Sequence, residues 1–237
     1  MAKKIVYIGI DPGFSGGITI IDGKKVIVHD IPTYTTITST KKTKQHYDLH
    51  KIIEIFSKYL DRDVECALES VSVMPGEGSV SSFNFGRGIG QLEGIVTFAK
   101  FNLTTVTPQK WKKGFPNLVT PDILAFKAEQ KEIRLKNKEL ALKEKDTKET
   151  NKKVKDLNQK SQNKKIIAAL KKEQKENKNK IAKLGRSVKS AAKSNARQEA
   201  ALLCPELSES FKRKKDDGRA ESLLISFYIK RTKNELV

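Results

Sequence analysis

The stretch IVYIGIDPGFSGG, residues 5–17, decides the fold, because it reads as a buried strand that ends in a carboxylate and a glycine turn. Residues 5–10 are apolar without a break, which is typical of a strand covered on both faces at the centre of a sheet. Asp11 follows directly, and a carboxylate at the tip of such a strand needs a partner, for which a metal ion is the leading candidate. Gly13 and Gly16 allow a tight turn and leave room for a group to approach closely.

Strand and helix patterns then alternate as far as residue 116. Residues 17–22 and 25–31 predict two further strands, and Asp22-Gly23 between them is a hairpin signal, so the chain begins as an antiparallel meander. This succession predicts an α/β domain. The elements expected next are a polar loop over 33–45, a helix from Leu49 to Leu60, a strand that ends at Glu69, a helix over 83–100 and a strand over 102–106.

The charge of the chain indicates a nucleic-acid partner. Its 237 residues contain 47 Lys and Arg against 28 Asp and Glu, a net charge of +19. This excess favours a polyanion, and no hydrophobic stretch is long enough to span a bilayer, so we expect no membrane partner. The first residues lack the apolar core and cleavage site of a signal peptide, so we expect a cytoplasmic protein, in the host cytoplasm if a phage encodes it.

Residues 117–193 differ in composition from the rest and predict a Lys-rich helical insertion. Residues 122–184 contain no Pro or Gly, and residues 117–200 hold 24 Lys and Arg against 11 Asp and Glu. We expect two long helices with a break around 146–151. A basic arm along duplex DNA is the preferred interpretation, and partial disorder is the alternative. The second helix carries a heptad at Ile167, Leu170, Gln174, Asn177, Ile181, Leu184, Val188 and Ala191.

The remaining residues, 1–116 and 194–237, form the predicted core, and its carboxylates follow a pattern. Asp11 and Glu69 each end a strand, and the last helix opens with Asp217 and Glu221 four residues apart on one face. Such a set of like charges repels unless cations bind, and hard oxygen ligands suit Mg²⁺ or Mn²⁺. Alternatively, Asp217 caps the helix and Glu221 is solvated.

Five segments resemble the RuvC-type Holliday-junction resolvases, particularly the shorter phage members. The resemblance covers about 1–116 and 194–232, and its segments occur in the order known for that family. The segments are GIDPGFSGGI (9–18), ALES (67–70), TPQKWKK (107–113), ARQEAALLCPEL (196–207) and KRKKDDGRAESLLIS (212–226).

The resemblance implies an RNase H-like fold, with a five-stranded mixed sheet between helices. By motif position, the family's four acidic metal ligands match Asp11, Glu69, Asp217 and Glu221. Bacterial members space the last pair three residues apart, so Asp216 is an alternative ligand. Two Mg²⁺ ions, or Mn²⁺ in their place, would then hydrolyse a phosphodiester without a covalent intermediate.

The resemblance also implies contacts with branched double-stranded DNA, cut by a homodimer with one active site for each strand. In the family, the loop after the fourth strand inserts apolar residues at the junction centre, which here are Val73 and Met74, with Phe83 and Phe85 as alternatives. A place in the core or in a dimer interface is the other interpretation of all four. The residues expected to hold phosphates are Lys110, Lys112, Lys113, Lys212, Arg213, Lys214, Lys215 and Arg219.

The helix over 83–100 is the expected dimer contact. Its glycines, Gly86, Gly88, Gly90 and Gly94, weaken a helix, so we expect them to pack closely against a neighbouring backbone.

Two other function classes remain open. A catalytically silent protein that binds branched DNA would keep the same fold. The glycine turn after Asp11 also resembles the phosphate loop of actin-like kinases and ATPases, but these need a second similar half, for which the chain has no room.

Overall fold

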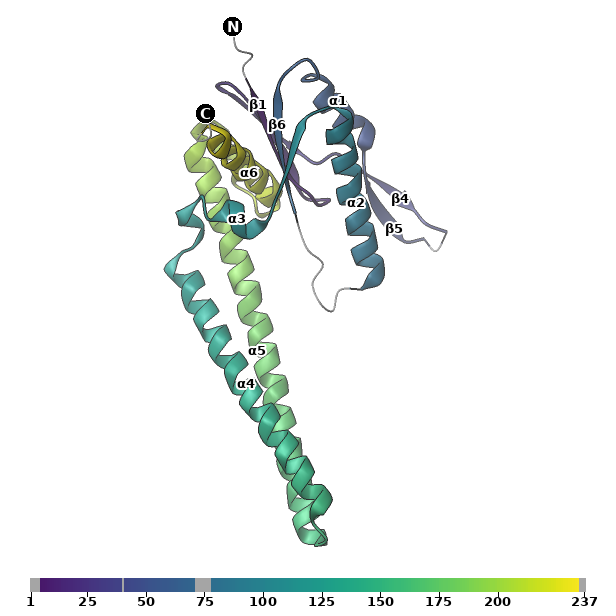
Figure 1. Cartoon of the computed structure of the whole chain (residues 1–237), viewed down its shortest axis with the longest axis vertical. Coiled ribbons are helices and arrows are strands. Elements are labelled where there is room, and N and C mark those ends of the chain that lie inside the picture. Colours follow the sequence, from purple (N-terminus) through teal and green to yellow (C-terminus); the bar gives the residue numbers. More distant parts are fainter. Residues whose placement is uncertain (1–4, 40, 71–77, 235–237) are drawn as a thin grey trace. The chain divides into compact units, whose positions relative to one another are not determined.

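A computed structural model describes residues 5–39, 41–70 and 78–234 of the chain. The chain divides into two compact units. The core unit comprises Met1–Leu118 and Ser194–Val237, and the insertion unit comprises Val119–Lys193. Figure 1 shows the elements of each unit, and each unit is described separately below.

The core unit is built on a five-stranded mixed sheet with the strand order β3-β2-β1-β6-β7. β1 pairs antiparallel with β2, and β2 with β3, whereas β6 and β7 run parallel to β1. The predicted meander, the α/β class and the five-stranded mixed sheet are confirmed. The strands are β1 (Val6–Asp11), β2 (Gly17–Asp22), β3 (Lys25–Asp30), β6 (Val64–Glu69) and β7 (Asn102–Val106).

Two helices, α1 (Leu49–Ser57) and α2 (Ser79–Phe98), cover one face of this sheet (Figure 1). Asp48 caps α1 by accepting a hydrogen bond from the backbone amide of Lys51. The apolar sides of both helices, including Ile52 and Leu92, join Ile8 of β1 in one buried cluster. Burial of these side chains holds the two helices against the sheet.

The opposite face is covered by α6 (Asp217–Asn234) together with α3 (Pro108–Lys112). Tyr7 points to this face because successive residues of a strand alternate between the two sides, and it shares a buried cluster with Trp111 and Leu224. The last turns of α5 (Leu157–Leu203) also belong to the core unit. Three short 3₁₀ segments complete it, at Pro116–Leu118, Pro205–Phe211 and Lys214–Asp216.

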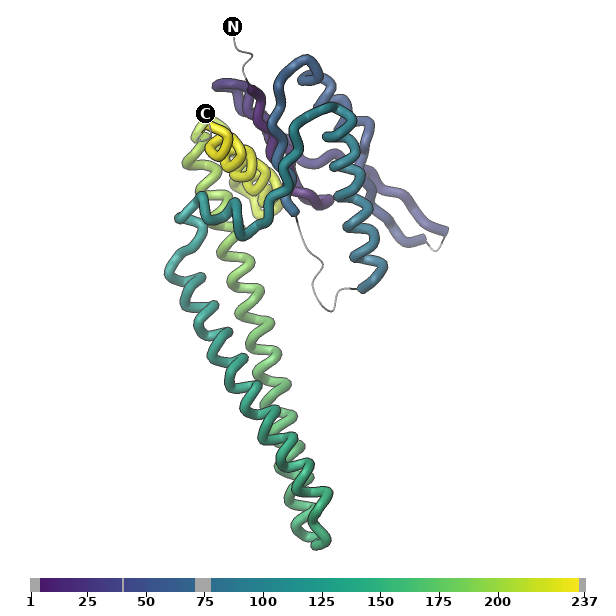
Figure 2. Tube along the Cα trace, in the orientation of Figure 1, coloured from purple at the N-terminus to yellow at the C-terminus, as the bar shows by residue number. Residues whose placement is uncertain are grey.

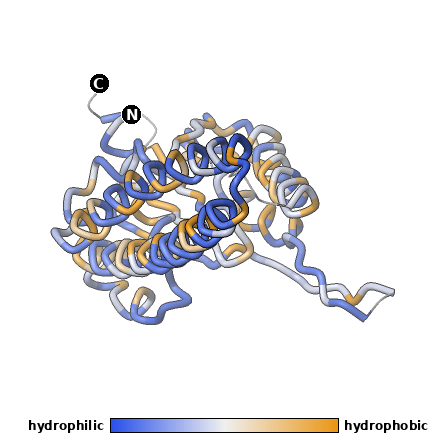
Figure 3. Tube along the Cα trace, turned by 90° about the horizontal axis from the view of Figure 1, so that it is seen from below, coloured by the Kyte–Doolittle hydropathy of each residue, from blue (hydrophilic) through white to orange (hydrophobic). Residues whose placement is uncertain are grey.

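The prediction of a polar loop over 33–45 is wrong, because this segment forms a hairpin of β4 (Thr33–Ile37) and β5 (Thr43–Tyr47). Threonine is β-branched and suits an extended backbone, so a Thr-rich polar segment favours strands where a partner segment is available. In the turn, the Thr38 hydroxyl donates to the carbonyl of Lys42 at 3.0 Å and accepts from its amide at 3.1 Å. Figure 3 shows that the hairpin is mostly hydrophilic.

Within one chain, only one of the α2 glycines has a close neighbour, and that neighbour is a side-chain ring and not the expected backbone. A side chain at Gly88 would overlap the Tyr47 ring, with Cε2 at 2.8 Å from the added Cβ. Gly86, Gly90 and Gly94 have no such neighbour within 4 Å among the described residues. The prediction is therefore wrong for these three within a single chain, because they lie away from the sheet.

The insertion unit contains α4 (Pro121–Lys153) and the first part of α5, which lie side by side (Figure 2). The predicted pair of long helices is confirmed, but the break lies at 154–156 and not at 146–151. The break follows from Val154, which adopts an extended conformation, and from Asp156, whose carboxylate accepts from the Asn158 amide at 2.8 Å. All eight heptad positions of α5 are partly buried.

Polar contacts join the two helices of the insertion unit. The Asn177 amide donates to Asn137 Oδ1 at 3.0 Å, and the Gln174 amide donates to Glu144 Oε2 at 3.0 Å. Such partly buried polar pairs fix the register of a helical pair at some cost in stability. Within the described residues, no helix of either unit is long and apolar enough to cross a membrane.

Candidate active site

Two of the predicted acids lie at the same edge of the sheet. Asp11 is the last residue of β1, and Glu69 is the last residue of β6. These strands are parallel neighbours in which Ile10 pairs with Leu68, so the next residues along both strands are Asp11 and Glu69. Parallel pairing therefore brings both carboxylates to the carboxyl ends of adjacent strands, where ligands bind in open α/β sheets.

The start of α6 reaches the same edge through glycines. Gly218 forms an isolated parallel bridge with Gly16, and a Cβ on either would overlap backbone atoms. This close approach places Asp217 beside the turn after β1, and Glu221 follows one helical turn later. The hydroxyls of Thr19 and Ser222 lie 2.8 Å apart and add a buried hydrogen bond between β2 and α6.

Glu69 has an unusual electrostatic environment. Its side chain is buried, and Oε1 accepts a 2.8 Å hydrogen bond from Trp111 Nε1. Burial raises the pKa of the Glu69 carboxyl, and the negative charge of Glu221 raises it further, against the opposing effects of Trp111 and Lys112. A carboxyl with these properties binds a cation readily, since the cation relieves both the burial and the repulsion.

Cationic side chains form ion pairs with the acids of α6. Lys112 Nζ lies 3.3 Å from Glu221 Oε1 and also 4.8 Å from the centre of the Trp111 ring. Arg197 forms an ion pair with Asp217, and both side chains are largely buried. The two cations therefore offset the repulsion between the acids.

Asp216 has a structural role in this fold. It is buried, and the Arg213 backbone amide donates to its Oδ2 at 2.9 Å while the Arg213 guanidinium binds Oδ1. Burial alone would raise the pKa of the Asp216 carboxyl, but the Arg213 contacts and the charge of Arg219 hold it below its usual value. Arg219 itself forms a two-pronged ion pair with Asp30. Arg213 and Arg219 are thus both engaged with carboxylates, although both were expected at phosphates.

The lysines expected at phosphates lie on the surface of the core unit, except Lys112, which is half-buried and paired with Glu221. Lys110 and Lys113 are exposed at α3, and Lys214 and Lys215 are exposed just before α6. Lys212 forms an ion pair with Glu209. Val73 and Met74 lie outside the described residues, whereas Phe83, their alternative, is 68% exposed at the start of α2.

The donor chemistry of the four predicted acids fits a hard divalent cation, because all four side chains are carboxylates. Over the described ranges 5–39, 41–70 and 78–234, however, no three His, Cys, Asp or Glu side chains converge as metal ligands. Nitrogen donors contact the oxygens instead, from Trp111, Lys112 and Arg197. Metal binding thus requires new side-chain conformations at Asp217 and Glu221.

Trp111 and Arg197 were not singled out from the sequence. Trp111 is the one tryptophan of the chain and lies inside the QKWKK segment, whose lysines drew attention instead. Arg197 lies in the motif ARQEAALLCPEL, and only the folded chain brings it to Asp217, twenty residues later. The sequence offered one signal for Arg197, because this charged residue lies among the apolar residues of a predicted helix.

No family model matches the chain, and no curated protein matches it. Among solved structures, the chain is similar to RuvC of T. thermophilus, which was solved in complex with a Holliday junction substrate. The identity is 12%, the match covers 47% of this chain and 70% of that chain, and the TM-score is 0.33. A similarity of this size defines neither the fold nor the function.

Proposed function

We propose that the chain is a metal-dependent endonuclease that cuts branched DNA, of the Holliday-junction resolvase type. The observation that supports the proposal is that parallel pairing brings Asp11 and Glu69 to the carboxyl ends of adjacent strands, while the Gly16–Gly218 bridge holds the start of α6 beside the turn after β1. The positive charge of the chain and the exposed lysines of α3 and of the segment before α6 support a DNA substrate.

In this proposal the four acids would hold two Mg²⁺ ions, which supply an activated water and stabilise the leaving 3′ oxygen. Trp111 orients the Glu69 carboxylate through its indole N–H and stabilises the ionised form that binding requires. Before a metal binds, Arg197 and Lys112 offset the charges of Asp217 and Glu221. Exposed lysines would hold the flanking phosphates.

A comparison of wild type with Asp11→Asn tests the activity. Four-way, flap and linear DNA are each incubated with Mg²⁺, with Mn²⁺ and with EDTA, and the products are separated on denaturing gels. We expect wild type to cut the branched substrates only when a metal is present, and Asp11→Asn to lose at least about 10²-fold in rate, as for removal of a group that positions charge in the transition state. Equal cleavage by the two proteins would reject the site.

A catalytically silent protein that binds branched DNA is the second candidate. The ion pairs of Asp217 with Arg197 and of Glu221 with Lys112 favour it, because they satisfy these acids without a metal. This candidate predicts binding of four-way junctions with no cleavage in any metal. It also predicts that Asp11→Asn leaves junction affinity unchanged.

We also propose that the chain cuts as a homodimer through α2. The supporting observation is an exposed apolar surface on this helix, with Phe83 68% and Phe98 83% exposed and the unpacked Gly86, Gly90 and Gly94 between them. Light scattering should give a dimer mass for wild type and a monomer mass for Phe83→Ser with Phe98→Ser. A dimer that survives both changes would place the interface elsewhere.

The insertion unit is proposed to bind duplex DNA beside the branch. The proposal is supported by charge, since α4 and the first part of α5 carry most of the basic excess of the chain. Contacts with phosphates made by this unit would add to affinity and to its dependence on salt.

A further inference from the structure

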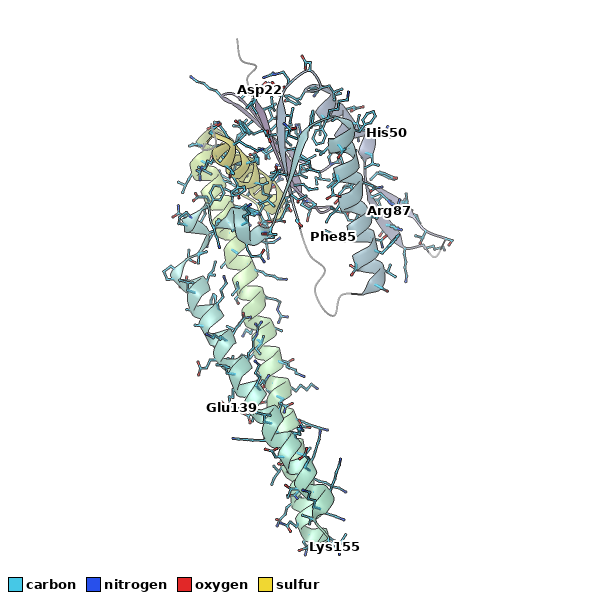
Figure 4. All side chains as sticks on the ribbon, viewed as in Figure 1. Asp22, His50, Phe85, Arg87, Glu139 and Lys155 are labelled. Carbon is cyan, nitrogen blue, oxygen red and sulfur yellow. The ribbon has the colours of Figure 1, made fainter. Side chains whose placement is uncertain are left out.

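A pocket of about 390 Å³ lies in the core unit, on the side of the sheet that α2 covers. The β4–β5 hairpin, the start of α1 and the middle of α2 line it, and Phe14 from the turn after β1 closes it. Figure 4 labels His50 and Arg87, which border the pocket from α1 and α2. Its volume is at the lower end of the range for small-ligand pockets, about 300–1,000 Å³.

Aromatic side chains form one part of the wall. Tyr34 stacks on His46, with ring centres 5.3 Å apart and planes 22° from parallel, and Tyr34 is 50% exposed. Phe14 is 43% exposed and meets Tyr47 edge to face at 5.1 Å. Aromatic faces that border a hollow offer stacking surfaces to a flat ligand, and nucleic-acid bases use such surfaces.

Cations and amides form the rest of the wall. Lys44 and Arg87 border the pocket, and among the residues that the structure describes no carboxylate pairs with either. The one acid of the wall, Asp48, is engaged with Lys51 and with the amide that it caps. The net charge of the wall is therefore positive, which suits a phosphate. Asn84 Nδ2 donates to the Val80 carbonyl at 2.8 Å, so the polar group that Asn84 offers to a base is its Oδ1 acceptor.

The pocket adjoins the candidate active site. Phe14 lies three residues after Asp11, and the Tyr47 hydroxyl hydrogen-bonds to the Gly13 backbone between them. Burial raises the pKa of Tyr47 to about 12, with a contribution from the charge of Asp11. The turn after β1 thus separates the pocket from the carboxylates.

We propose that this pocket binds one unpaired nucleotide of DNA, with its base against Tyr34 and Phe14 and its phosphate at Lys44 and Arg87. A base offers its faces to a protein only when it has left the duplex stack, so the ligand is an unpaired nucleotide and not a base pair. The inference rests on the proposed function in that the ligand belongs to the DNA substrate. Recognition of such a nucleotide would select branched DNA, in which bases unpair.

Binding measurements in EDTA test the pocket apart from cleavage. The probe is a fluorescent duplex with a single thymidine bulge, compared with the same duplex carrying an abasic site at the bulge. We expect wild type to bind the thymidine bulge about 5- to 100-fold more tightly, the range for stacking one base. Tyr34→Ala should abolish this difference and Tyr34→Phe should keep it.

The matched control is Ile37→Ala, on the same strand but outside the pocket, which should keep the difference. Equal affinity of wild type for the two bulges, or a preserved difference in Tyr34→Ala, would overturn the proposal. A second arm replaces Lys44 and Arg87 by Gln, which should weaken both bulges equally and lower the salt slope by about 2. The control replaces Lys24 and Lys25, both exposed at the β2–β3 turn, by Gln and so removes the same number of charges. It should lower the salt slope less, and an equal effect would reject the phosphate contact at Lys44 and Arg87.

Free thymidine monophosphate distinguishes the source of the nucleotide. If it competes with the bulge at equal concentration, the pocket serves a free nucleotide, and the DNA assignment fails. If wild type cuts no DNA but still prefers the thymidine bulge to the abasic bulge, the proposed nuclease function is rejected and the proposed nucleotide pocket stands. If wild type cuts branched DNA but binds both bulges equally, only the pocket proposal is rejected.

Discussion

Replacement of Gly218 by Ala tests how α6 reaches the edge of the sheet. The added methyl group would meet Ser15 O and the Cα and C atoms of Gly16, all closer than real Cβ contacts. These are backbone atoms, so no rotamer change removes the overlap. The start of α6 must move away from the turn after β1, and it carries Asp217 and Glu221 with it.

The expected cost follows from this overlap. Forcing an extra carbon into a packed site costs about 1–3 kcal/mol, and the better helix propensity of Ala recovers at most about 1 kcal/mol. We expect a net loss of about 2 kcal/mol in the free energy of unfolding of the core unit. With a urea dependence of about 2 kcal/mol per molar, the midpoint should fall by about 1 M.

Fluorescence of Trp111 is the appropriate probe. It is the only tryptophan, it is fully buried, and it packs in the same cluster as Leu224 of α6. Urea titrations at a protein concentration where light scattering gives the monomer mass should compare wild type, Gly218→Ala and the control Gly90→Ala, whose added methyl group meets open space within one chain. Gly90→Ala should raise stability by about 0.5–1 kcal/mol. A midpoint for Gly218→Ala within about 0.2 M of wild type would refute the close approach.

Three further predictions concern the carboxylates and the insertion unit. Trp111→Phe removes a hydrogen-bond donor to the ionised Glu69 carboxylate, so the raised pKa of Glu69 should rise further. Mg²⁺ affinity is measured by calorimetry between pH 5 and 8. As the solution is acidified, the variant should lose Mg²⁺ affinity at a higher pH than wild type does. Asn177→Leu leaves Asn137 Oδ1 without its hydrogen-bond donor and should lower the free energy of unfolding by about 1–3 kcal/mol, measured by thermal unfolding followed by circular dichroism. Replacing both Asn137 and Asn177 by Leu should restore the wild-type stability or exceed it. Deletion of 122–190 should keep metal-dependent cleavage but weaken DNA binding and flatten its salt dependence, and unchanged binding in a salt titration would contradict a DNA-binding role for this unit.

The stability of the core unit should also depend on pH through Glu69. Its pKa is raised in the folded chain, so the folded state favours the protonated carboxyl. Its contribution to folding is therefore most favourable below the unfolded pKa of about 4.3 and is lost as the pH rises through the folded pKa. Glu69→Gln should remove this dependence in urea titrations followed by Trp111 fluorescence, whereas an unchanged pH profile would contradict the assignment.

The carboxylates could be found from the sequence because strand ends are visible in it. An apolar run stops at Asp11, another stops at Glu69, and periodicity places Asp217 and Glu221 on one helix face. The hairpin of β4 and β5 could not be found in this way, because most of its residues are polar and exposed, and Tyr47 is the one residue of the two strands that joins the hydrophobic core.

Local periodicity and composition are enough to predict the α/β class, the acids at the strand ends, the basic charge and the two helices of the insertion unit. They do not predict that Arg197 and Lys112 face the acids of α6, or that Tyr34 and Arg87 border one pocket. These contacts join residues that are far apart in the chain. Their geometry follows from parallel pairing of β1 with β6 and from the close approach of Gly218 to Gly16, which no local pattern records.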